Sequence, residues 1–165
     1  MSRQEARAVL LEAFQRCGFK IPFFKFEPFY MGYHLFQHTD VVFGFGIMDR
    51  QRRHLYGRQG VMIQVSLLLQ KKVYVYDEGS QLWYVAKIHQ KRGKKGQLKV
   101  WHRFEPCSRP KDPGHSMYFY DAFDPPEPTL RLIHQMTSRS EQAQTCPGQH
   151  PDPPVDVMPS NPTYY

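Results

Sequence analysis

Residues 40–46 read DVVFGFG, residues 56–64 read YGRQGVMIQ, and residues 73–77 read VYVYD. The first and third stretches are short, apolar and rich in Val and aromatic residues, which is typical of buried strands. The second stretch places glycines directly before an apolar run of helical length. The order of strand, glycine loop, helix and strand predicts a parallel pair of strands joined by a right-handed crossover helix.

The glycines of this unit are candidate ligand contacts, because a residue without Cβ lets a phosphate approach backbone N–H groups. Gly57 and Gly60 precede the predicted helix, which we expect over residues 60–70; the alternative is a tight turn without a ligand. Gly44 and Gly46 would let a ligand approach the end of the first strand, and their alternative role is to relieve crowding. The glycine pattern therefore predicts an anion site at the helix N-terminus.

Two polar residues extend the candidate ligand site. Asp77 ends the second predicted strand, where open α/β sheets place ligand contacts. Its alternative role is a turn cap, because Asp-Glu-Gly-Ser is also good turn sequence. Gln64 lies on the predicted helix, where it would contact either the ligand or solvent.

The same residues carry a family resemblance. Gly57–Gly60 is similar to a Gly-Gly-x-Gly loop, Gln64 to a helix glutamine, residues 73–77 to a Pro-Val-Tyr-Val-Phe-Asp-like strand, and Trp83 to a following aromatic residue. In this order and spacing the chain resembles the C-terminal half of the SLOG superfamily, a Rossmann-like group that includes the LOG nucleotide phosphoribohydrolases and relatives of DNA-processing protein. Arg58 replaces the usual second glycine, so its side chain either blocks or contacts a phosphate.

The resemblance implies binding of a phosphate-bearing, nucleotide-like ligand. LOG-type hydrolysis would need catalytic Arg and Glu in a Pro-Gly-Gly-x-Gly-Thr setting. Here no proline precedes Gly57, Val61 replaces the threonine, and Gln64 stands where an acid would help. We therefore expect a sensor or scaffold without turnover, with no catalytic residue and no cofactor.

Positive charge is concentrated in one segment. Of 22 Lys and Arg, seven lie between Ala86 and Phe104, where no acid occurs, and the remaining 15 equal the 15 Asp and Glu of the whole chain. Residues 82–89 and 97–104 are strand-like on either side of a glycine-containing charged linker, which predicts a hairpin over 82–104. The seven cations are Lys87, Lys91, Arg92, Lys94, Lys95, Lys99 and Arg103.

This basic hairpin supports an alternative function. Cationic side chains would bind the phosphates of a nucleic acid, and Trp83, Tyr84 and Trp101 would stack on bases. The structural alternative is a solvated loop with its aromatic residues in the core beneath it. Strand alternation also separates Trp101 from its immediate neighbours, so the indole and much of the charge need not share a face.

The remaining sequence defines the fold class: an α/β protein with a small or partial Rossmann-like parallel sheet, flanking helices, the added basic β-hairpin and a disordered C-terminal tail. Ser2 and Glu5 form a capping-box pattern at the start of an expected helix over 3–17. We expect one domain over 1–136 and a Pro/Ser/Gln-rich tail over 137–165. Further elements are expected over 19–26 (strand), 29–37 (helix), 117–120 (strand) and 129–136 (short helix).

Several other classes are disfavoured. Three dispersed cysteines argue against a disulfide framework, and His34 and His38 have no neighbouring ligands to complete a metal site. No apolar run is long enough for a membrane span, and the N-terminal segment is not a signal core. We expect a cytoplasmic protein, with the nucleus as the alternative implied by the basic cluster, and a homo-oligomer or a partner chain covering the sheet edge.

The tail holds one short motif. Residues 161–164 read Asn-Pro-Thr-Tyr, which matches the turn read by some phosphotyrosine-binding modules. Four residues in a proline-rich segment often match by chance, so the sequence assigns no partner from this motif.

Overall fold

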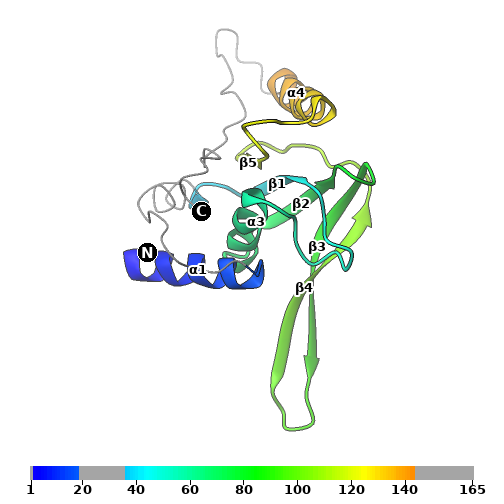
Figure 1. Ribbon diagram of the computed structural model, residues 1–165. Helices are drawn as coiled ribbons and strands as arrows, with labels where there is room; N and C mark the ends of the chain where they lie inside the picture. The colour runs from blue at the N-terminus through cyan, green and yellow to red at the C-terminus, as the bar shows by residue number, and fades with distance from the viewer. Residues whose placement is uncertain (1, 19–35, 144–165) are drawn as a thin grey trace.

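The computed structural model describes residues 2–18 and 36–143, which form an α/β fold around one mixed sheet (Figure 1). β1 lies between β2 and β5 and pairs in parallel with both, while β3 and β4 continue the sheet beyond β2 in antiparallel pairing. The spatial order of strands is β4-β3-β2-β1-β5. The strands are β1 (Val41–Gly46), β2 (Lys72–Asp77), β3 (Leu82–Arg92), β4 (Leu98–Cys107) and β5 (Ser116–Phe119), and the helices of the described residues are α1 (Arg3–Arg16), α3 (Arg58–Leu68) and α4 (Glu127–Ala143).

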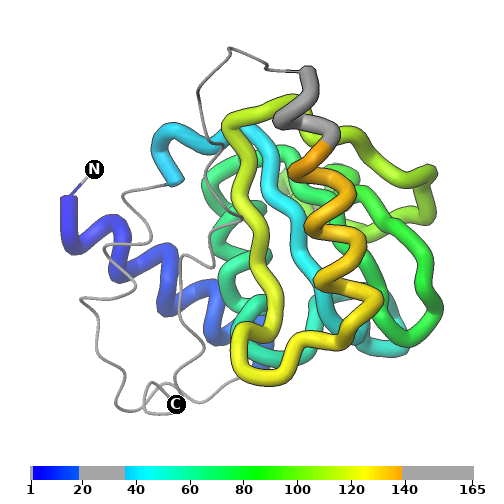
Figure 2. Tube along the Cα trace, turned by 90° about the horizontal axis from the view of Figure 1, so that it is seen from above, coloured from blue at the N-terminus to red at the C-terminus, as the bar shows by residue number. Residues whose placement is uncertain are grey.

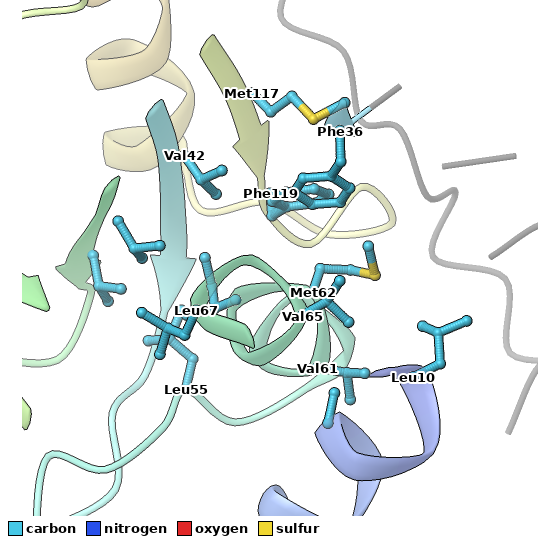
Figure 3. Packing of buried hydrophobic residues seen from close by; sticks show 14 of the residues in the cluster. Leu10, Phe36, Val42, Leu55, Val61, Met62, Val65, Leu67, Met117 and Phe119 are labelled. Carbon is cyan, nitrogen blue, oxygen red and sulfur yellow. The ribbon is translucent and has the colours of Figure 1, made fainter. Parts of the chain in front are cut away.

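The sheet is covered on both faces, and each face has its own apolar core. Val42 and Val75 face α3 and α1, where they pack in one cluster with Val61, Val65 and Leu10 (Figure 3). The opposite face is aromatic and lies against α4, as Figure 2 shows from above. Its main members are Phe43, Phe45, Tyr76, Trp83 and Tyr118, with Ile133 and Met136 from α4. Burial on both faces explains why β1 is a continuous apolar run rather than an alternating one.

Stacked rings fix the aromatic face. The ring of Phe43 lies 5.1 Å from that of Tyr118 on β5 and 5.7 Å from that of Tyr74 on β2, both nearly parallel. Trp83 packs edge-on against Phe45, with 5.6 Å between the rings. These offset and edge-to-face contacts are favourable for aromatic pairs and join four neighbouring strands, β5, β1, β2 and β3.

The N-terminal helix confirms the capping-box prediction. The Ser2 hydroxyl accepts a hydrogen bond from the Glu5 backbone N–H at 3.2 Å, and the Glu5 carboxylate accepts one from the Ser2 N–H at 2.7 Å. Ala6, Leu10 and Phe14 form the buried stripe of α1, which packs in the same core cluster as α3.

α3 approaches β1 so closely that glycines are required at the contact. A Cβ built on Gly44 would lie 2.5 Å from Cδ1 of Ile63, a side chain of α3. A Cβ on Gly60 would lie 2.0 Å from the backbone oxygen of Leu55, in the loop before the helix. These two glycines therefore let the helix, the strand and their connecting loop pack without a side chain between them.

Two predicted helices have different bounds in the structure. α3 was expected over residues 60–70, but it begins two residues earlier, at Arg58, and ends two residues earlier, at Leu68. Gly57 at φ 86° is its N-cap, and Gln70 at φ 59° prevents its continuation. α4 is much longer than the short helix expected over 129–136, so residues 137–143, which we assigned to the tail, are helical. The polar composition of residues 137–143 gave no sign of a helix, whereas Ile133 and Met136, inside the predicted range, pack on the sheet.

Other predicted elements are confirmed, differ in their bounds, or lie outside the residues that the structure describes. The parallel pairing of β1 and β2 and the hairpin of β3 and β4 are confirmed, although both hairpin strands are longer than expected. The strand expected over 117–120 is β5, which starts one residue earlier. The elements expected over 19–26 and 29–37, His34 included, lie wholly or mainly outside the described residues, as does the tail from residue 144 onward.

We predict that Gly60→Ala destabilises the fold, because the new Cβ would collide with backbone that cannot move aside easily. The expected loss in unfolding free energy is about 1–3 kcal/mol, measured by urea denaturation. Gly44→Ala should destabilise less, because the end of the Ile63 side chain can shift. Gly79→Ala is the control, because its Cβ would meet only Asp77 at an ordinary 3.5 Å. Equal stabilities for Gly60→Ala and Gly79→Ala would contradict this packing.

Candidate functional site

The candidate site lies where β1 and β2 end and α3 begins. Gly46, the last residue of β1, is the register partner of Asp77, the last residue of β2. The chain then passes through a loop of ten residues, 47–56, before the N-cap Gly57. Parallel strands and their crossover helix bring these termini together, and ligands of open α/β sheets bind at this edge.

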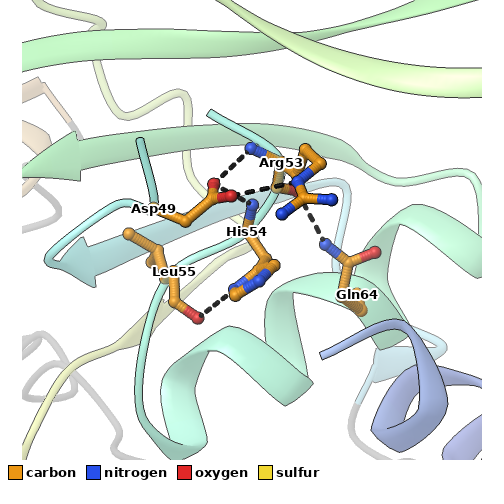
Figure 4. A network of polar contacts seen from close by, with 5 residues as sticks. All are labelled: Asp49, Arg53, His54, Leu55 and Gln64. Carbon is orange, nitrogen blue, oxygen red and sulfur yellow. Dashed lines mark hydrogen bonds and ion pairs between the residues drawn. The ribbon is translucent and has the colours of Figure 1, made fainter. Parts of the chain in front are cut away.

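A buried carboxylate organises the loop (Figure 4). Asp49 is only 6% exposed, and one of its carboxylate oxygens accepts hydrogen bonds from the backbone N–H groups of Arg53 and His54, at 2.6 and 3.2 Å. The other oxygen accepts a bond from Nε of Arg53 at 3.0 Å. Three donors on one carboxylate fold residues 49–54 into a compact turn.

The ionisation of Asp49 follows from these contacts. Burial pushes its pKa upward, but the hydrogen bonds from the Arg53 and His54 backbone and from the Arg53 side chain outweigh burial and lower the pKa from its ordinary value of 3.8. Asp49 is therefore ionised at neutral pH, and its negative charge is used to hold the loop.

Gln64 is a structural contact of the same loop. Its side chain is 5% exposed, and its Nε2 donates a hydrogen bond to the backbone oxygen of Arg53 at 3.3 Å. The residue thus joins α3 to the loop from inside the protein, and it does not face a ligand from the surface.

Asp77 has the geometry of a turn cap. One carboxylate oxygen accepts bonds from the N–H groups of Met48 and Gly79, both at 3.2 Å. The other accepts bonds from the N–H and hydroxyl of Ser80, at 3.3 and 2.7 Å. A carboxylate offers about four acceptor positions, so all are used, and Asp77 has none left for a ligand hydroxyl. Its role in the structure is to join the β2–β3 turn to the loop that follows β1.

Gln59 fills the space between the two remaining glycines. A Cβ on Gly46 would lie 2.8 Å from its Nε2, and a Cβ on Gly57 would lie 2.8 Å from its Oε1. The amide of Gln59 therefore lies across the end of β1 and the start of α3. The side chain of Gln59 is half-buried.

The start of α3 carries positive charge and no acid. Gly57 has no side chain to cap the helix, the first helical residue is Arg58, and the first turn has no Asp or Glu. The dipole of a helix favours an anion at this end. Tyr56 and Ile47, each 54% exposed, lie beside it and are joined by a hydrogen bond from the Tyr56 N–H to the Ile47 oxygen at 2.8 Å.

A third acid near this edge, Glu78, is hydrogen-bonded to α4. Glu78 donates its backbone N–H to the Gly46 oxygen at 2.7 Å, and its carboxylate accepts a hydrogen bond from the Thr129 hydroxyl. Burial raises the pKa of Glu78, with a further contribution from the nearby negative charges of Asp121 and Asp77. The carboxylate thus joins β2 to the N-terminal turn of α4.

The seven cations of the hairpin lie far along β3 and β4 from this site. β3 starts beside Asp77 and runs antiparallel to β2, so the hairpin tip projects beyond the opposite end of the strands (Figure 1). The structure therefore separates the two candidate surfaces that the sequence identified.

Two of the three cysteines, Cys17 and Cys107, lie in the described part of the chain. Burial raises the pKa of the Cys107 thiol, and that of Cys17 to about 12, so both are poor nucleophiles at neutral pH. In the described parts of the chain, no three His, Cys, Asp or Glu side chains are grouped to hold a metal ion. Across the same residues, no helix has the length and apolar character needed to cross a bilayer.

Sequence reasoning missed Asp49, Tyr56 and Gln59. Asp49 had one usable signal, since an acid at the start of a basic loop is a common local cap for the N–H groups that follow. Tyr56 and Gln59 had no such signal in the sequence. Tyr56 is notable for its exposure, and Gln59 for its position between Gly46 and Gly57, and both features are visible only in the folded chain.

Comparison of the chain with protein-family models, with curated proteins and with solved structures gave no match.

We predict that Asp49→Asn destabilises the protein by about 1–3 kcal/mol at neutral pH, because a charged acceptor of three hydrogen bonds is lost. Since folding lowers the pKa of Asp49, its contribution is present above pH 3.8 and is lost as the pH falls through the folded-state value. Urea denaturation should therefore show the difference between Asp49→Asn and wild type shrinking below pH 3.8. Asp124→Asn, at an exposed acid, is the control and should change stability little at either pH. If the difference in stability between Asp49→Asn and wild type did not change with pH, the role assigned to the Asp49 carboxylate would be contradicted.

Proposed function

We propose that this chain binds a nucleotide-like ligand with a phosphate at the N-terminus of α3 and acts as a sensor or scaffold. The observation that carries the proposal is the start of α3 itself, where a glycine N-cap is followed directly by Arg58 and no acid lies in the first turn. Backbone N–H groups, the helix dipole and a guanidinium all favour an anion at that position.

The surrounding topology supports the proposal. β1 and β2 are parallel with α3 between them in sequence, and α3 starts at their carboxyl ends, which is the arrangement of Rossmann-like nucleotide sites. Membership in the SLOG superfamily is part of the same proposal, and it rests on the residue pattern of Gly57–Gly60 and Gln64. In this interpretation Arg58 replaces a glycine of the loop and supplies a side-chain contact to the phosphate.

Exposed apolar surface beside the helix start suits the rest of such a ligand. Tyr56 lies directly before Gly57, its ring is open to solvent, and His54 packs edge-on against it at 5.6 Å. A base would stack on the Tyr56 ring, and Ile47 would extend the contact. Arg50 is exposed in the same loop and adds positive charge to it, whereas the charge of Arg53 is balanced by Asp49.

The acids at this edge favour binding over turnover. Asp49 and Asp77 accept three and four hydrogen bonds respectively, and the carboxylate of Glu78 is bonded to Thr129. A general base must be able to reach a proton of the substrate or of an attacking water. Each of these carboxylates instead holds a loop or joins two elements.

The direct test is calorimetric titration of the full chain with a panel of adenine, guanine, uracil and cytosine nucleotides. At least one should bind, and Arg58→Gln should weaken that binding about ten- to a hundredfold, because a charge-assisted contact to phosphate is lost. Arg7→Gln, at an exposed arginine of α1, is the charge-matched control and should bind like wild type.

The base contact has its own pair of variants. Tyr56→Phe keeps the ring and should retain most of the affinity, whereas Tyr56→Ala should lose stacking and weaken binding at least severalfold. Absence of binding for the whole panel, or equal affinities for Arg58→Gln and Arg7→Gln, would contradict the proposal. Gly60 is unsuitable for this test, because a side chain there disrupts packing against Leu55.

A further inference from the structure

The outer half of the hairpin is a two-stranded ribbon. β2 pairs with β3 only through residues 82–85, whereas β3 and β4 remain paired as far as Arg92 and Leu98. Residues 86–92 and 98–104 therefore extend past β2, and Figure 1 shows the ribbon projecting away from the helices and the rest of the sheet. Near the base of the ribbon, Ala86 and Phe104 pack in the core with α1 and α3. An isolated two-stranded ribbon is only marginally stable in water.

The register sorts the side chains of this ribbon onto two different faces. Opposed residues of an antiparallel pair share a face, and successive residues alternate. One face has the directly opposed pairs Lys87–Arg103, His89–Trp101 and Lys91–Lys99. The other face has the pairs Ile88–His102, Gln90–Val100 and Arg92–Leu98. Four of the seven hairpin cations thus surround the indole on one face, and Lys94 and Lys95 add charge at the tip.

The cationic face is unfavourable for the fold by itself. Like charges directly opposite each other in a sheet are destabilising, and this face has two such pairs, one on each side of Trp101. The nearest acid on the same face is Glu105, whose carboxylate lies 3.2 Å from the His89 ring. A polyanion lying along the face would relieve the repulsion that the fold alone leaves in place.

The ring of Trp101 is supported by the stacked ring of His89. His89 lies parallel to it at 5.8 Å, and the contact with Glu105 fixes the imidazole that supports the indole. Trp101 nevertheless keeps 38% of its surface exposed, between cations at neighbouring positions of the same face. A flat exposed ring between positive charges is the arrangement with which proteins hold a base and its flanking phosphates.

We propose that this face of the ribbon, formed by Lys87, His89, Lys91, Lys99, Trp101 and Arg103, binds single-stranded nucleic acid. The lysines and the arginine contact phosphates, and Trp101 stacks on a base. A single strand is favoured over a duplex because its bases are free to stack on a side chain. An acidic protein would satisfy the charges but would leave the exposed indole without a planar partner. The site lies at the opposite end of β3 from the start of α3, so it is independent of the nucleotide proposal.

The test is fluorescence titration of the full chain with a labelled oligothymidylate of about 15 nucleotides, over a range of salt concentrations. Lys91→Gln/Lys99→Gln should weaken binding and reduce the slope of log K against log salt by about 1.4, as expected for two lost phosphate contacts. Arg7→Gln/Lys111→Gln removes the same charge from exposed positions outside the ribbon and should leave the slope unchanged.

Melting temperatures distinguish a binding role of these side chains from a role in stabilising the fold. Removing an opposed lysine pair should leave the melting temperature of Lys91→Gln/Lys99→Gln equal to or above that of wild type while binding falls. Trp101→Leu should weaken binding about five- to a hundredfold, whereas Trp101→Tyr, which keeps a ring, should retain most of it. Trp101→Leu binding like wild type, equal salt slopes for the two double variants, or a duplex of the same length binding at least as tightly would each overturn the proposal.

Discussion

The close contact of α3 with β1 and with the Leu55 carbonyl is the constraint on which the rest of the structure depends. Gly44 and Gly60 have no side chain to separate these elements. A Cβ added at Gly44 would lie 2.5 Å from Ile63, and one added at Gly60 would lie 2.0 Å from the Leu55 oxygen. Without that contact, Ile63 and Val61 could not reach the core, and the start of α3 would not lie at the end of β1. Two glycines that pattern alone presents as ligand contacts thus act first through packing, and they place Gly57 and Arg58 at the edge of the sheet.

The sequence predicted the central unit well because its signals are local. Apolar runs, a capping box and glycine punctuation are sufficient for α1, β1, α3, β2 and the hairpin. The extent of α4 was missed because residues 137–143 are polar in composition, and its buried side chains Ile133 and Met136 are defined only by the aromatic face of the sheet. The site was harder to predict, because Asp77 and Gln64 bond to loop atoms that are distant in sequence.

Charge is divided between the two ends of the strands. At the carboxyl ends of β1 and β2, the carboxylates of Asp49 and Asp77 accept hydrogen bonds from the surrounding loops. At the other end, the hairpin register gathers four cations around Trp101 on one face and leaves Ile88, Leu98 and Val100 exposed on the other. The residue count alone predicts a basic segment, but only the register shows that the indole and the charge share a face. A small phosphate ligand and a polymeric one would therefore meet different surfaces.

Binding of an anion at the start of α3 is our main proposal for this chain. The most direct measurement is a two-dimensional amide NMR titration of the full chain with the nucleotide that binds most tightly. We expect the largest shifts on the backbone N–H groups of Gly57, Arg58 and Gln59, while the signals of the ribbon residues 86–92 stay in place. Shifts confined to the hairpin, or no shift at residues 57–59 under saturating ligand, would contradict it.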